Sequence, residues 1–221
     1  RLNTTAASED WWRTDNVNDE SSSEGVSHPF EGNPNFRQEL DLSGQCLSYI
    51  AGLSSTYVAL TNLSLSNNAI QKMESLPHSL KRLDFSHNLL REISGLEQHF
   101  HLTSLDLSHN SISRITGLES CTGLTDLSVA SNQLAAVTDL ELLDRLSRLD
   151  VSNNRVGAAE GLRTLSLNGR LLFLDTRGNP CARRPNHRQQ LISMLPQLAF
   201  LDGAKMPRNG LRPPSPNNHS G

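Results

Sequence analysis

Apolar residues recur along this chain in one spaced pattern, L-x-x-L-x-L-x-x-N-x-Φ, in which Φ is any apolar residue. The pattern starts six times, at Leu60, Leu80, Leu102, Leu124, Leu146 and Leu171. Successive starts are 20, 22, 22, 22 and 25 residues apart. A period of this length indicates a solenoid of stacked units, because one such unit cannot bury its apolar side alone.

The third unit shows which elements to expect. Leu105 and Leu107 are two residues apart, which is the period of a strand with one buried face. Ile112, Ile115 and Leu118 follow at intervals of three, which suits a return path of turns or a short 3₁₀ segment. Each unit therefore predicts one short strand, and stacking predicts a parallel sheet along one side of the solenoid.

One polar residue is as regular as the leucines, and it stands just after each predicted strand. This Asn column comprises Asn68, Asn88, Asn110, Asn132, Asn154 and Asn179. An amide there can both donate to and accept from backbone groups left unpaired where the chain turns. We therefore predict a structural role for the column. A divergent unit precedes the six, with Leu40, Leu42, Leu47, Ile50 and Leu53 at the apolar positions and Gln45 in place of Asn.

These units resemble the leucine-rich repeat family, and within it the 22-residue intracellular class typified by the phosphatase-1 regulatory subunit and the axonemal dynein light chain. Residues from Gly178-Asn179-Pro180 through Leu195-Pro196 to Leu201-Asp202-Gly203 look like that family's C-terminal cap. The resemblance implies an α/β solenoid, a right-handed horseshoe of about seven turns with a parallel sheet on its concave face. It also implies 3₁₀ or irregular segments on the convex face and a helical cap over about residues 178–206.

Two places depart from the family pattern. His187 stands where the cap more often has Tyr, and Ala159 stands where a larger apolar residue is usual. The spacing between Leu162 and Leu171 is also longer than elsewhere, which predicts a looser or bulged convex side at this repeat.

The chain divides into a repeat domain, expected over 36–206, and two tails. Residues 1–35 are rich in Ser, Gly, Pro and acids and have the composition of a flexible tail. They contain Trp11 and Trp12, for which two interpretations stay open: a docking motif, or a cover for the exposed edge of the first repeat. Residues 207–221, with Pro213-Pro214 and Pro216, read as a Pro-rich linker or tail.

Charge is unevenly distributed although the net charge is only -3. Residues 1–41 carry nine acids and three bases, whereas residues 163–221 carry nine bases and two acids. A basic patch at the cap, comprising Arg177, Arg183, Arg184 and Arg188, can meet an acidic surface such as a tubulin tail, or can simply be a solvated helix face. Nucleic acid is the weaker interpretation, because no stacking aromatics accompany the arginines.

The outward residues of the predicted strands form the expected partner-binding surface on the concave face. The candidates are Asp41, Arg82, Asp84, Asp106, Asp126, Arg148, Asp150, Phe173 and Asp175. The Asp residues among them recur at the repeat period, so they are either part of the repeat consensus or selected for a partner.

Catalytic and metal sites are not expected. Asp84-Phe85-Ser86-His87 and Asp106-Leu107-Ser108-His109 contain the residue types of a hydrolase triad, but each His follows its Ser in the turn instead of lying between Ser and Asp. His87 and His109 occupy equivalent positions, yet no third metal ligand has an obvious spacing. The sequence also lacks a P-loop and a dinucleotide fingerprint, so we expect no cofactor.

Composition sets the remaining expectations. No apolar run is long enough to span a bilayer, and three scattered cysteines argue against a disulfide framework, which favours a reducing compartment, the cytoplasm. We expect a monomeric, non-catalytic scaffold or adaptor that binds protein partners in an intracellular assembly. The resemblance favours a cytoskeletal, ciliary or basal-body setting; the alternatives are a phosphatase-1 regulatory subunit and a ribonucleoprotein component.

Overall fold

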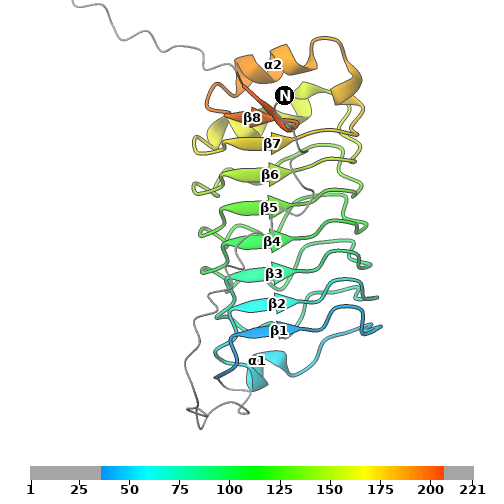
Figure 1. Ribbon diagram of the computed structural model, residues 1–221, viewed down its shortest axis with the longest axis vertical. Coiled ribbons are helices and arrows are strands. Elements are labelled where there is room, and N and C mark those ends of the chain that lie inside the picture. Colours follow the sequence, from blue (N-terminus) through cyan, green and yellow to red (C-terminus); the bar gives the residue numbers. More distant parts are fainter. Residues whose placement is uncertain (1–35, 207–221) are drawn as a thin grey trace, which may run out of the picture.

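The computed structural model describes residues 36–206. The chain coils into a solenoid in which every turn contributes one three-residue strand to a common sheet (Figure 1). The strands are β1 (Glu39–Asp41), β2 (Asn62–Ser64), β3 (Arg82–Asp84), β4 (Ser104–Asp106), β5 (Asp126–Ser128), β6 (Arg148–Asp150), β7 (Phe173–Asp175), β8 (Phe200–Leu201) and β9 (Ala204–Lys205). The helical segments are α1 (Leu53–Thr56), η2 (Ala159–Leu167), η3 (Cys181–Arg183) and α2 (His187–Met194).

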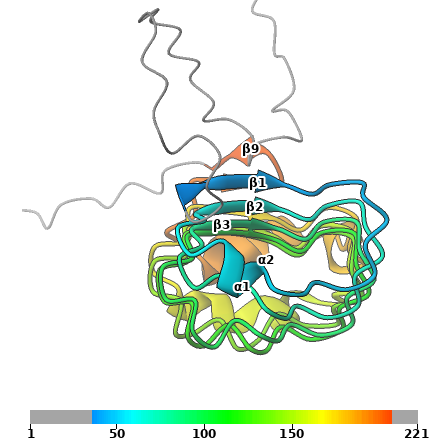
Figure 2. The same ribbon diagram turned by 90° about the horizontal axis from the view of Figure 1, so that it is seen from below.

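The sheet is parallel from β1 to β8 and follows the order of the chain. The register places each strand's three residues beside those of the next, so that Leu83 pairs with Leu105 and Leu105 with Leu127. Only β9 runs antiparallel, closing a hairpin with β8. Seven strands, β1 to β7, are therefore joined by six returns, and each return is an arc that leads away from the sheet and back (Figure 2).

The core lies between the strands and the arcs. In the third repeat Leu102, Leu105, Leu107, Ile112 and Ile115 are all exposed by 1% or less. The first turn is less well covered, since Leu40, Ile50 and Leu53 keep 7 to 8% exposure. A terminal turn has a neighbour on one side only, which explains this difference.

The Asn column has the structural role predicted for it. Asn132 accepts from the Ile112 backbone N–H through Oδ1 at 2.9 Å and donates from Nδ2 to the Leu107 carbonyl of the preceding turn, also at 2.9 Å. The same amide donates to Val129 and Ala130 in its own turn. Equivalent bonds recur at the other five positions, so each Asn joins two turns.

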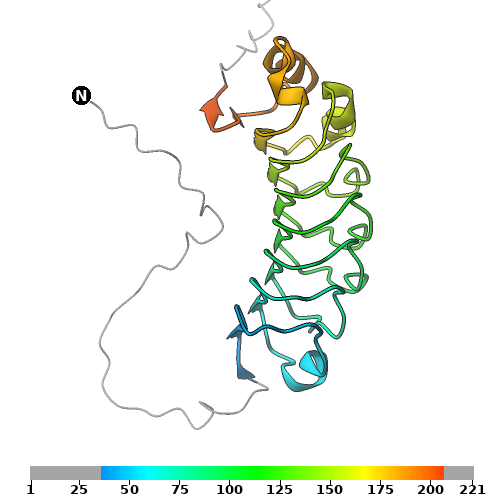
Figure 3. The same ribbon diagram turned by 90° about the vertical axis from the view of Figure 1, so that its right-hand side faces the viewer.

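The longer spacing before Leu171 produces an ordered element. Ala159–Leu167 form the nine-residue 3₁₀ helix η2, with Leu162 and Leu165 buried. Figure 3 shows η2 on the side of the solenoid away from the strands. The looser arc expected at this repeat is thus a helical one.

At the C-terminal end α2 packs against η2 and η3. The unusual His187 is buried, and its Nε2 lies 2.8 Å from Thr176 Oγ1. Thr176 Oγ1 in turn donates to Asp202 Oδ1 at 2.9 Å, so His187 Nε2–H is the donor to the threonine. Burial lowers the pKa of His187, which keeps the imidazole neutral in this chain of hydrogen bonds.

Candidate binding face

The outward side of β1 to β7, which we call the strand face, carries two rows of side chains. Successive strand residues point to opposite sides of a sheet, so the first and third residues of each strand face outward when the central Leu faces the core. The first row is Glu39, Asn62, Arg82, Ser104, Asp126, Arg148 and Phe173. The second row is Asp41, Ser64, Asp84, Asp106, Ser128, Asp150 and Asp175.

The second row is partly closed to solvent. Asp84 and Asp106 are exposed by only 8% and 7%, while Asp150 and Asp175 are half-buried and Asp41 is exposed. Asp84 and Asp106, two of the residues expected to bind a partner, therefore present little carboxylate surface to solvent. Because parallel strands keep this row in register, the middle members are flanked on both sides by the side chains of neighbouring strands.

These aspartates stabilise the turn that follows each strand. Asp106 Oδ1 accepts from the Ser108 backbone N–H at 2.8 Å, and Asp84 and Asp150 accept in the same way from the residue two positions on. Such a bond holds the chain in a local turn. The recurrence of Asp in this row is thus explained by the turn that every repeat must make.

Burial has an electrostatic consequence at Asp106. Removal of its carboxylate from water raises its pKa to about 6, and the nearby Asp84 carboxylate adds to the rise, while hydrogen bonds from Ser108 oppose it. Burial likewise raises the pKa of Asp150. The fold therefore disfavours the ionised form of the carboxylates at the centre of the strand face.

The first row is more accessible and is linked near its C-terminal end. Arg148 Nε lies 3.3 Å from Asp126 Oδ1. The Arg148 guanidinium carbon also lies 4.2 Å from the centre of the Phe173 ring, within the range of a cation–π contact. Phe173 stacks on Phe200 with 4.9 Å between ring centres and 5° between planes. Four side chains from β5, β6, β7 and β8 thus form one continuous run, the Arg–Phe run.

Phe200 was missed by sequence reasoning. It lies in β8, directly beside Phe173 of β7 in the parallel register. The triplet Phe173-Leu174-Asp175 recurs as Phe200-Leu201-Asp202, and this repetition is the signal that identifies β8 as one more strand with the same outward aromatic position.

At the N-terminal end the first row is polar. Asn62 Nδ2 donates to Glu39 Oε1 at 2.8 Å, and Arg82 is exposed. The strand face thus changes along its length from polar and charged to aromatic.

The basic patch of the cap is exposed in all four of its members. Arg177 pairs with Asp175, its Nε lying 2.9 Å from Oδ2, so one of the four is partly neutralised. The guanidinium nitrogens of Arg188 lie 3.5 Å from the carbonyl oxygens of Leu201 and Lys205. Arg183 and Arg184 lie in and just after η3 with their side chains in solvent.

Each of the two Asp-x-Ser-His runs begins at the last residue of its strand, β3 or β4, and continues into the turn that follows. His87 and His109 stack face to face, with 4.0 Å between ring centres and 8° between planes. Among residues 36–206 no three His, Cys, Asp or Glu side chains gather as metal ligands would.

Trp11 and Trp12 lie outside the described residues. No helix within residues 36–206 has the length and apolar character needed to cross a bilayer.

Comparisons with known proteins agree with this fold. The family described as Leucine Rich repeats (2 copies) matches residues 100–142, the region of β4 and β5. A search of curated protein sequences finds no match to the chain.

Solved structures with the same fold include three from Listeria monocytogenes. An internalin, inlF, has a TM-score of 0.62 at 23% identity over 76% of this chain and 48% of its own length. Internalin C2 has a TM-score of 0.61 at 20% identity over 74% of this chain and 79% of its own. The functional domain of InlJ, which includes a cysteine ladder, has a TM-score of 0.53 at 23% identity over 74% and 41%. The present chain thus spans about half the length of the first of these proteins.

The class that these findings define is one of fold: residues 36–206 have the leucine-rich repeat fold, and residues 100–142 match the leucine-rich repeat family. Solenoids of this kind generally bind other proteins through the extended surface that their stacked strands provide.

Proposed function

We propose that this chain is a non-catalytic scaffold or adaptor that binds a protein partner through its strand face. The observation that carries the proposal is the Arg–Phe run, Asp126, Arg148, Phe173 and Phe200, which presents aromatic and guanidinium groups in a fixed arrangement. Residues that dominate protein interfaces are enriched in aromatics and Arg. The supporting strands are held in register, which lowers the ordering cost of association.

We further propose that binding takes place in an intracellular assembly, with a cytoskeletal, ciliary or basal-body setting as the first candidate. Cys121 and Cys181 are buried free thiols and Cys46 is an exposed one, which suits a reducing compartment. Burial raises the pKa of Cys121 to about 11, so this thiol stays protonated and unreactive. The chain acts as a monomer in this proposal.

A regulatory role toward protein phosphatase 1 is the second candidate, and one observation favours it. Phe173 and Phe200 form an aromatic site at one end of the strand face, and aromatic anchors dominate protein interfaces. A ribonucleoprotein role is the third candidate and rests on the exposed arginines of the cap.

Capture from native extract followed by mass spectrometry separates these candidates. A cytoskeletal adaptor is expected to enrich axonemal or basal-body proteins at physiological salt. Co-purification of a phosphatase catalytic subunit whose activity changes with added chain would replace that proposal with the second. Recovery of RNA that falls steeply as salt is raised would support the third.

A further inference from the structure

The repeat that starts at Leu60 is 20 residues long, two fewer than each of the next three repeats, and the shortfall lies in one arc. Four positions separate Leu76 from Leu80, whereas six separate Leu96 from Leu102 in the next repeat. The arcs are equivalent, because the Leu80 backbone N–H bonds the Pro77 carbonyl as the Leu102 N–H bonds the His99 carbonyl. The arc that ends at Leu102 therefore packs against a shorter neighbour, the arc that ends at Leu80.

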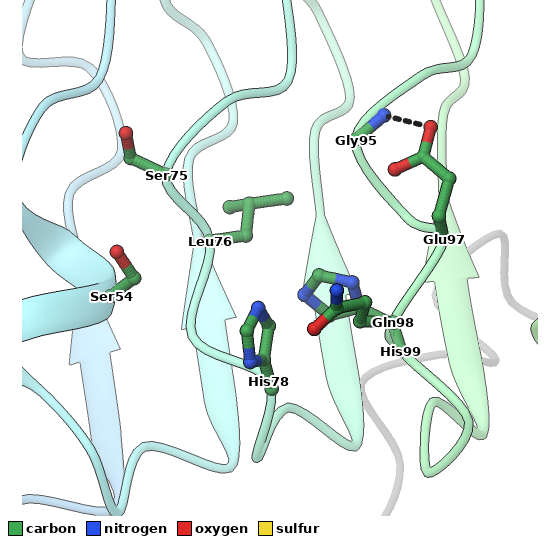
Figure 4. Close-up of a pocket in the computed structure, with 8 residues that line it drawn as sticks. All are labelled: Ser54, Ser75, Leu76, His78, Gly95, Glu97, Gln98 and His99. Carbon is green, nitrogen blue, oxygen red and sulfur yellow. Dashed lines mark hydrogen bonds between the residues drawn. The ribbon is translucent and has the colours of Figure 1, made fainter.

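A hollow of about 260 Å³ lies between these arcs, away from the strand face (Figure 4). It is lined by Ser54, Ser75, Leu76, His78, Gly95, Glu97, Gln98 and His99. Sites for drug-sized molecules span roughly 300–1,000 Å³. This hollow is smaller and suits a single long side chain.

His99 is the buried polar group of the hollow. It is exposed by 2%, and neither Nδ1 nor Nε2 makes a hydrogen bond of normal geometry. At the equivalent position of later repeats, Cys121 Sγ donates to the Leu96 carbonyl and Asn168 Nδ2 donates to the Leu140 carbonyl of the preceding repeat. Buried polar groups are normally paired. The Pro77 and Leu96 carbonyls lie near the ring and attract its N–H, so the neutral imidazole keeps one acceptor nitrogen for an occupant of the hollow.

The charge of the lining is negative. Burial and the neighbouring His78, whose ring meets that of His99 edge to face at 5.6 Å, lower the pKa of His99, so its imidazole is neutral and offers an acceptor nitrogen. Glu97 is the carboxylate among the eight lining residues. Its Oε1 accepts from the Gly95 N–H at 3.1 Å, as Figure 4 shows, and Oε2 has no partner within residues 36–206.

We propose that this hollow is a second binding site, which receives an arginine side chain of a protein partner. The guanidinium carries five N–H donors in a planar fork, which can reach the free oxygen of Glu97 and the acceptor nitrogen of His99 together. An anionic occupant would meet the Glu97 carboxylate without a compensating cation in the lining. The site is distinct from the strand face and goes beyond the scaffold function proposed above.

The test is an NMR titration of the full chain with N-acetyl-arginine methylamide, followed through the imidazole signals of His78 and His99. We expect saturable shifts with a dissociation constant on the order of 1–10 mM, as befits one side chain. The neutral isostere N-acetyl-citrulline methylamide should bind at least about tenfold more weakly, the equivalent of about 1.4 kcal/mol. Equal binding of the two probes, or no saturable shift, would overturn the proposal.

Glu97→Gln and Glu119→Gln form a matched pair of variants. Glu119 Oε1 accepts from the Gly117 N–H at 3.1 Å, just as Glu97 does from Gly95, but Glu119 does not line the hollow. Glu97→Gln should abolish the shifts and Glu119→Gln should keep them. His99→Leu, which the fold should accept because Leu143 occupies the equivalent position, should weaken binding as read at His78. Unchanged binding in Glu97→Gln would overturn the proposal.

Discussion

At the scale of single residues, the Asn column carries the link between turns. Each side chain makes up to four hydrogen bonds to backbone groups, and two of them reach the preceding turn. These backbone groups lie beyond the ends of the strands, which are only three residues long in β1 to β7, so they cannot be paired by hydrogen bonds within the sheet. One amide per turn therefore replaces secondary structure where the chain leaves the sheet.

Asn132→Ala should lower the free energy of unfolding by about 2–4 kcal/mol, because it leaves the buried Ile112 N–H and Leu107 carbonyl without partners. Chemical denaturation measures the loss. Ser113→Ala, at an exposed position of the same repeat, serves as the control and should change stability by less than about 0.5 kcal/mol. Equal stability of the two variants would contradict the role given to the Asn column.

Asp106 predicts a pH dependence of stability. Its pKa is about 6 in the folded chain and about 3.9 in an unfolded one, so ionisation favours unfolding as pH rises between these values. Between pH 4.5 and 7.5 the wild type should lose about 2 kcal/mol that Asp106→Asn does not lose. Asn keeps an oxygen that can accept from Ser108.

Denaturation midpoints at the two pH values test this prediction. Asp144→Asn, which alters an exposed aspartate, is the control and should follow the wild type. A pH dependence of Asp106→Asn that matches the wild type would show that Asp106 ionises freely in the folded state.

At the scale of elements, the arcs that contain Gly95 and Gly117 stack closely at these glycines, although the same repeat position holds Ser75 and Asp139, also with positive φ, in the neighbouring arcs. Gly95 and Gly117 have φ angles of +76° and +79°, and a Cβ at Gly117 would lie 2.5 Å from the Ile93 carbonyl oxygen. The arcs thus approach each other by backbone, and a side chain would separate them.

Gly117→Ala should therefore destabilise the fold by at least about 2 kcal/mol, from the unfavourable φ and from the contact with the Ile93 carbonyl. Gly157→Ala is the matched control, because a Cβ there meets nothing within 4 Å and its φ is not in the left-handed region. Thermal unfolding should show a clear drop in Tm for the first variant alone. A comparable drop in both variants would contradict the close approach of the arcs.

Local spacing predicted the elements that repeat and not those that occur once. The strands follow from pairs such as Leu105 and Leu107, because a period of two repeated at a fixed interval has one structural solution. The helix η2 did not follow, since extra residues within an arc are compatible with a bulge or a helix, and packing of Leu162 and Leu165 decides between them. The burial of Asp84 and Asp106 depends on neighbouring strands, which spacing along one strand does not report.

At the scale of the whole molecule, the solenoid offers two separate surfaces. The strand face is ordered by register and ends in the Arg–Phe run, where Phe173 was expected and Phe200 was not. The hollow at His99 arises because one repeat is 20 residues long and the next is 22, a difference that the sequence shows. Which residues line the hollow depends on the packing of neighbouring arcs, which the sequence does not show.

The central claim is that partners bind the strand face, and quantitative capture from native extract tests it most directly. The variant Arg148→Ala/Phe173→Ala removes two members of the Arg–Phe run. The control Arg163→Ala/Leu167→Ala removes an exposed arginine and an exposed apolar side chain from η2, on the opposite side of the solenoid (Figure 3).

We expect the strand-face variant to capture at least about tenfold less partner than the wild type, because removal of interface anchors weakens binding by this much or more. The η2 control should retain capture within about twofold, and both variants should unfold at wild-type temperatures within a few degrees, roughly the effect of 1 kcal/mol. Equal capture by the wild type and the strand-face variant, or loss confined to the η2 control, would contradict the account.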